Sequence, residues 1–124
     1  MNRRLLVLAF AVLVIGLCFS ISSWSVSESE IVGTYVNRNY RNPIAELPHM
    51  PDTLVLLPQG HLISRYYGRG SYTIEMHGLG KKLLLKPGSG SAVAPSMVGI
   101  DVSIDRDLRL IMSTDFDQYY EKLE

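Results

Sequence analysis

Glycine, basic residues and a histidine gather in one stretch, residues 66–82, which reads YYGRGSYTIEMHGLGKK. Such a mixture could form a phosphate-binding loop, in which consecutive backbone N–H groups at a helix N-terminus hold the phosphate. The spacing does not fit, because the GRG segment lacks the third glycine of a dinucleotide fingerprint and leads into an alternating strand pattern. The GLGKK segment lacks both the first glycine and the Ser or Thr of a P-loop. We therefore expect hairpin turns whose positive φ angles are supplied by Gly68, Gly70, Gly78 and Gly80.

Metal and catalytic patterns are absent from the sequence. The histidines His49, His61 and His77 show no HxH or HExxH spacing. Asp105 and Asp107 lack the third acid and the glycine that a calcium loop requires. No GxSxG elbow occurs either. We predict no metal, no cofactor and no catalytic residue, and we keep a hydrolase as a third alternative because a catalytic triad is recognised by geometry.

The segment VNRNYRNP offers a different kind of chemistry, that of recognition. Tyrosine and arginine are enriched at binding hot spots, and here Arg38, Tyr40 and Arg41 lie among asparagines. The connection from Asn37 to Asp52 is long for a compact domain and contains three prolines, which oppose strand pairing. We predict that Arg38, Tyr40 and Arg41 form a partner-binding patch, the alternative being an ordinary polar crossover loop.

An apolar N-terminal segment precedes this patch in the chain. Arg3 and Arg4 precede an apolar run that extends without charge from Leu5 to Trp24. We predict that residues 1–27 are a transmembrane signal anchor that crosses the membrane through residues 5–24, or else a cleaved signal peptide. A third alternative is a lipoprotein, because IGLC at 15–18 resembles a lipobox, although Leu17 stands where that motif has a small residue.

Residues 28–124 are then the exported domain. Short alternating or apolar segments about ten residues apart predict strands at 31–36, 53–58, 61–67, 71–77, 82–86, 97–104 and 108–112. The tail DFDQYYEKLE is either a last strand or one helical turn. The predicted fold is mainly β, a small antiparallel meander forming a barrel or half-barrel, preceded by one hydrophobic helix. We expect a monomer without disulfides, because this part has no cysteine.

The exported part resembles lipocalin-like domains of short bacterial envelope proteins. Gly33-Thr34-Tyr35 resembles the G-x-W opening of lipocalins, and DTLVLLPQGHLIS and GRGSYTI resemble the strand patterns of such envelope proteins. The resemblance implies a fold and a bacterial cell-envelope location, anchored in the inner membrane or released after cleavage. Twelve basic and twelve acidic residues cancel, which argues against nucleic-acid binding. We expect a module that binds a protein partner, or alternatively a lipocalin-like binder of a small apolar ligand.

Overall fold

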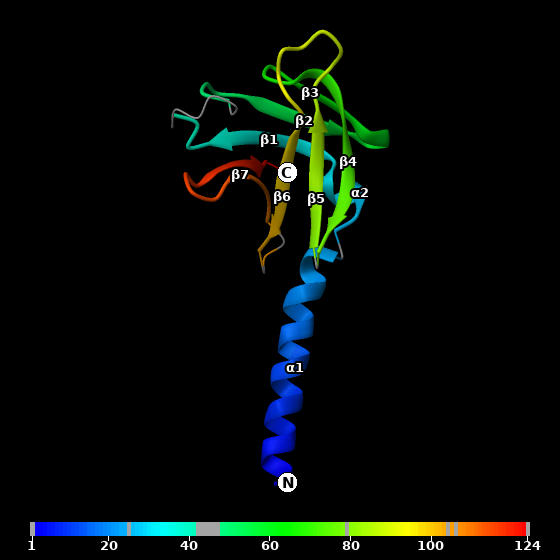
Figure 1. Cartoon of the computed structure of the whole chain (residues 1–124), viewed down its shortest axis with the longest axis vertical. Helices are drawn as coiled ribbons and strands as arrows, with labels where there is room; N and C mark the ends of the chain where they lie inside the picture. The colour runs from blue at the N-terminus through cyan, green and yellow to red at the C-terminus, as the bar shows by residue number, and fades with distance from the viewer. Residues whose placement is uncertain are drawn as a thin grey trace.

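A computed structural model describes residues 2–24, 26–41, 48–78, 80–103, 105 and 107–123, with the backbone alone for residues 16–24. The described chain forms a long helix that projects from a small β-barrel (Figure 1). Its elements are α1 (Arg3–Trp24), α2 (Glu28–Ile31), β1 (Gly33–Arg38), β2 (Thr53–Leu57), the 3₁₀ turn η1 (Pro58–Gly60), β3 (His61–Ser64), β4 (Gly68–His77), β5 (Gly80–Lys86), β6 (Ser96–Val102), β7 (Leu108–Ser113) and β8 (Gln118–Lys122).

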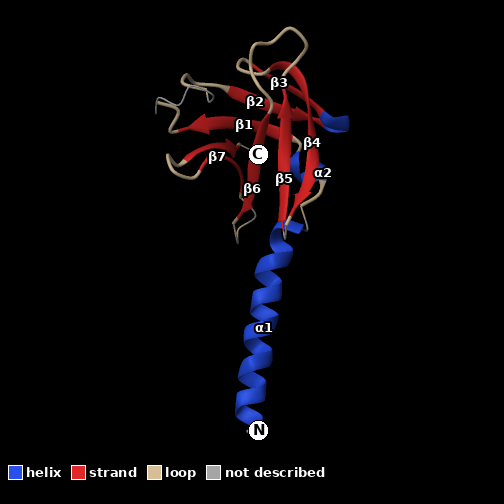
Figure 2. Ribbon diagram, in the orientation of Figure 1, coloured by secondary structure: helices blue, strands red, loops and turns tan. Residues whose placement is uncertain are grey.

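The strands pair in chain order, each antiparallel to the next, and β8 returns to pair with β1. Figure 2 shows the strands gathered at one end of the long helix α1. Tyr35 lies opposite Lys122 in this closing pair. The predicted antiparallel meander is therefore confirmed, and the open choice between barrel and half-barrel is decided in favour of a closed barrel. The acidic–aromatic tail supplies the closing strand. Closure pairs both edges of the sheet, which would otherwise expose unpaired backbone groups.

Alternation along the strands places bulky side chains inside the barrel. In β1 and β2, for example, Tyr35, Leu54 and Leu56 have no exposed surface. The strands around the barrel contribute to one continuous core with Leu62, Tyr67, Tyr72, Leu83, Leu85, Val98, Ile100, Leu108, Leu110 and Tyr120. A barrel of this strand number has an interior just wide enough for side chains to fill, and here tyrosine and leucine fill it.

Because the strands alternate in direction, the connections fall at two ends of the barrel. The end that carries α1 and α2 is called the proximal end here; η1 also lies there, and so do the C-terminal ends of β4 and β6. The opposite end, called the distal end, carries the described connecting residues 39–41, 48–52, 65–67, 87–95 and 114–117. Figure 1 shows α1 extending away from the distal end.

The segment from Val26 to Ile31, called the plug here, closes the proximal end of the barrel. Val26 and Ile31 are fully buried in the barrel core. The hydroxyl of Tyr35 donates a hydrogen bond of 2.5 Å to the carbonyl of Ile31. Lys81 Nζ donates to the carbonyl of Val26 at 3.0 Å, and Lys122 Nζ donates to the carbonyl of Glu30. The folded core thus begins at Val26, two residues before the boundary at 28 that we drew from the sequence.

Helix α1 contacts β5 and β6 at its barrel end, and its apolar side chains stay exposed along residues 5–15. Leu5, Phe10 and Ile15, for instance, are 60%, 70% and 57% exposed. Among the residues whose side chains the structure describes, which in α1 end at Ile15, we find no helix with both the length and the apolar character needed to cross a membrane.

The glycine-rich stretch is a pair of hairpin connections, as expected, but its glycines act in different ways. Gly68 and Gly78 have positive φ angles, +68° and +59°. Gly70 does not, so the prediction for it is wrong: a Cβ there would lie 2.1 Å from the carbonyl oxygen of Lys86. Gly70 allows two backbones to approach closely. Gly80 opens β5 opposite His77.

Candidate functional site

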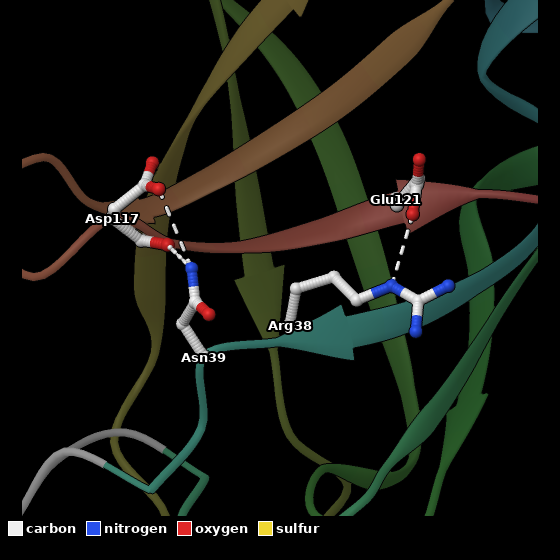
Figure 3. Close-up of polar contacts among 4 residues, drawn as sticks. All are labelled: Arg38, Asn39, Asp117 and Glu121. Carbon is white, nitrogen blue, oxygen red and sulfur yellow. Dashed lines mark hydrogen bonds and ion pairs between the residues drawn. The ribbon is translucent and has the colours of Figure 1, made fainter.

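The predicted patch begins at the distal end of β1. Arg38 Nε donates to Glu121 Oε2 on β8 at 2.9 Å, with the two side chains 51% and 38% exposed (Figure 3). Both strands are adjacent in the barrel, so this pair spans the seam that closes it. An exposed ion pair of this kind contributes about 0–1 kcal/mol. Arg38 is therefore partly neutralised but remains accessible to a partner.

Asn39 turns the chain away from β1. It has a positive φ angle of +57°, which asparagine tolerates better than most residues. Its Nδ2 donates to the carbonyl of Asp117 at 2.7 Å, also drawn in Figure 3. This contact joins the start of the long loop to the turn between β7 and β8.

Tyr40 and Arg41 follow in a turn. Tyr40 is half-buried and Arg41 is exposed. The structure thus places Arg38, Tyr40 and Arg41 together at the distal end, at the exit of β1. The next part of the loop, 42–47, lies outside the described residues.

A buried carboxylate that sequence reasoning missed organises the distal end. Asp52 is 6% exposed, and its Oδ1 accepts hydrogen bonds from the backbone N–H groups of Arg65 at 2.9 Å and Tyr66 at 3.2 Å. The hydroxyl of Tyr120 donates to Oδ2 at 2.6 Å. The backbone N–H of Asp52 donates to Asn37 Oδ1 at 2.8 Å. The three groups that donate to Oδ1 and Oδ2 compensate the burial of the carboxylate.

The contacts of Asp52 explain why β3 is shorter than the strand predicted from the sequence. The sequence predicted a strand over 61–67, but β3 ends at Ser64. Asp52 takes up the N–H groups of Arg65 and Tyr66, and Ser64 Oγ accepts from the N–H of Tyr67 at 2.7 Å. With their donors bonded to side chains, residues 65–67 form a turn instead of extending the ladder.

Tyr120 is held in its neutral form by the same network. Burial raises the pKa of its hydroxyl above the ordinary value, and the hydrogen bond to Asp52 and the charge of Asp52 raise it further. The hydroxyl therefore acts as a hydrogen-bond donor and not as a general acid or base near neutral pH. The arrangement is structural, since it fixes the loop at 52 to the turn at 65–66.

Two clefts lined by described residues share Arg65 and Tyr66 in their walls. One, of about 310 Å³, is lined by Pro48, His49, Met50, Pro51, Asp52, Arg65 and Tyr66. The other, of about 430 Å³, is lined by Arg65, Tyr66, Tyr67, Gly68, Arg69, Gly88, Ser89 and Ser91. The sequence carried a signal for this second region, because the RYY triplet repeats the arginine–tyrosine chemistry of the first loop.

Across the described ranges, no three His, Cys, Asp or Glu side chains lie together as a set able to hold a metal ion. His77 lies 3.9 Å from Glu75 on the same strand, away from the distal end. No protein family model, curated protein or solved structure matches the chain.

Proposed function

We propose that the protein is a membrane-anchored binding module of a bacterial cell envelope, and that it engages a protein partner with the distal end of its barrel. The apolar α1 would hold the chain in the membrane through residues 5–24, with Arg3 and Arg4 on the inner side. The exposed apolar side chains of α1 support this, because such a surface is unfavourable in water unless lipid or protein covers it.

The observation that carries the proposal is the contrast between the two ends. Val26 and Ile31 fill the proximal end of the barrel, and buried side chains fill the interior. A cleft of about 370 Å³ near that end, lined by the described residues Glu28, Gln59, Gly60, Tyr72, Thr73 and Ile74, has no arginine or lysine among them. The distal end presents arginine and tyrosine side chains beside open clefts. Loops supported by a rigid barrel are a common place for recognition. An anchor at the proximal end would direct this surface away from the membrane.

The lipocalin-like alternative requires space inside the barrel. Tyr35, Tyr67 and Tyr120 occupy that interior without exposed surface. The described clefts lie at the rim instead. A native mass spectrum of the protein purified from its own cells tests this alternative, since a retained apolar molecule would favour interior binding.

The triple substitution Arg38→Ala, Tyr40→Ala, Arg41→Ala tests the proposed surface. We expect the free energy of unfolding to fall by no more than about 1–2 kcal/mol, because one exposed ion pair and one half-buried ring are lost. Capture of the protein partner should weaken by about 2 kcal/mol or more if one of the three is a hot spot.

The matched control for this experiment is Lys82→Ala on the exposed face of β5, toward the proximal end. Pull-down from detergent-solubilised membranes with the full chain, read by quantitative mass spectrometry, measures the effect. A triple variant that keeps full stability and full capture would place the binding surface elsewhere.

A further inference from the structure

The clefts beside Arg65 and Tyr66 differ in chemistry. The wall of the first is largely apolar and includes Pro48, Met50 and Pro51, with Met50 58% exposed. The wall of the second carries the exposed residues Arg65 and Arg69 and the serines at 89 and 91. Arg65 and Tyr66 line both clefts, so an apolar and a cationic region share one border.

Backbone contacts hold the walls of the cationic cleft together. The N–H of Gly88 donates to the carbonyl of Tyr67 at 3.3 Å. A Cβ on Gly88 would lie 2.1 Å from the carbonyl oxygen of Arg69, and a Cβ on Gly70 would meet Lys86 equally closely. Glycine at both positions lets the 87–91 segment lie directly against the start of β4. A surface fixed in this way loses little conformational entropy when it binds a ligand.

The guanidinium groups in this cleft are available for an anion. In the part of the chain that the structure describes, the side chains of Arg65 and Arg69 make no ion pair. The carboxylate in the wall of the adjoining apolar cleft, that of Asp52, is 6% exposed and already accepts hydrogen bonds from Tyr120 and from backbone N–H groups. Arginine binds carboxylates with directed, charge-assisted hydrogen bonds.

We propose that these adjoining clefts bind an extended acidic segment of the protein partner, an inference that rests on the proposed function. An apolar side chain of the segment occupies the cleft beside Met50, and a neighbouring carboxylate is bound by Arg65 and Arg69. A peptide is favoured over a lipid headgroup because the clefts lie at the distal end, opposite the end where α1 enters the barrel.

The full chain in a non-ionic detergent, titrated with defined peptides, tests this proposal. The probes are the acetylated, amidated and fluorescently labelled pentapeptide EELEE and its neutral counterpart QQLQQ, and the readout is fluorescence anisotropy. We expect EELEE to bind at least tenfold more tightly than QQLQQ. Arg69→Glu should weaken EELEE binding at least tenfold, while the charge-matched control Lys82→Glu should change it less than twofold.

Several results would overturn the proposal: equal affinity for both peptides, no effect of Arg69→Glu, or an equal loss with Lys82→Glu. Arg69-dependent binding to phosphatidylglycerol vesicles without binding to EELEE would also overturn it. If Arg69→Glu melts early in circular dichroism, Arg69→Gln replaces it with the same expected direction. Partner capture that survives Arg69→Glu refutes the acidic-segment proposal alone, whereas capture through the proximal end refutes the proposed function.

Discussion

At the scale of single residues, the distal end combines groups that hold the structure with groups that face solvent. Asp52 and Tyr120 are buried and bonded to one another, so they stabilise the loop and the turn. Arg65 and Arg69 are exposed and carry the available charge. The sequence predicted the second kind of residue at Arg38, Tyr40 and Arg41 from composition alone. It could not reveal Asp52, because its partners at 65, 66 and 120 are distant in the chain.

The buried tyrosines predict how stability depends on pH. Burial raises the pKa values of Tyr35, Tyr67 and Tyr120 above the ordinary value near 10. The folded chain then holds these protons more tightly than the unfolded chain. Stability is therefore full below about pH 10 and is lost as the pH rises further, by up to about 1.4 kcal/mol per pH unit for each tyrosine.

Urea denaturation between pH 7 and pH 11 measures this dependence, with Tyr120→Phe as the comparison. The variant should lose about 1–3 kcal/mol at pH 7, because the buried carboxylate of Asp52 loses the hydroxyl that donates to its Oδ2. Its further loss above pH 10 should be less steep than that of the wild type, since one titrating group is gone. A wild-type stability that stays constant up to pH 11 would contradict the buried environment of these rings.

At the scale of elements, the strands could be predicted because alternation survives in a short window, as in MVGIDVSI. The closure of the barrel could not be predicted, because it depends on the pairing of β1 with β8. The paired residues of these two strands stand more than 80 positions apart in the sequence. The wrong prediction of a positive φ angle at Gly70 also arose from a contact between separate strands. The residue that requires glycine there, Lys86, lies on the next strand. The burial of the plug could not be predicted either, because in the sequence Val26 belongs to the polar stretch that follows the apolar segment.

The plug predicts a measurable contribution from a residue outside the barrel strands. Ile31→Ala should lower the free energy of unfolding by about 2–5 kcal/mol, because a fully buried side chain is lost from the core. Ser29→Ala, an exposed position in the same short helix, is the control and should stay within about 0.5 kcal/mol. Equal effects of the two substitutions in thermal or urea denaturation would show that the plug does not close the core.

The plug also bears on the predicted membrane segment. A signal peptide cleaved before Val26 would leave the core complete, whereas a cut after Ser27 would remove a fully buried side chain. If the segment is cleaved, we therefore expect the cut on the N-terminal side of Val26.

At the scale of the whole molecule, the two ends of the barrel differ in chemistry. One end is filled by the plug and joined to α1, and the other carries the arginine–tyrosine surfaces and the two clefts that share Arg65 and Tyr66. The interior is packed with side chains, so binding is expected at the distal rim. We therefore expect the partner to bind the end of the barrel that lies opposite α1.

Site-specific photo-crosslinking in living cells can distinguish the two ends of the barrel as the site of partner binding. A photoreactive amino acid is placed at the exposed distal positions Arg41 and Ser89, and separately at the exposed proximal positions Lys82 and Asp107. We predict that both distal positions yield a crosslink to the same protein and that the proximal positions yield none to it. Crosslinks to that protein from Lys82 and Asp107, with none from Arg41 or Ser89, would contradict the account.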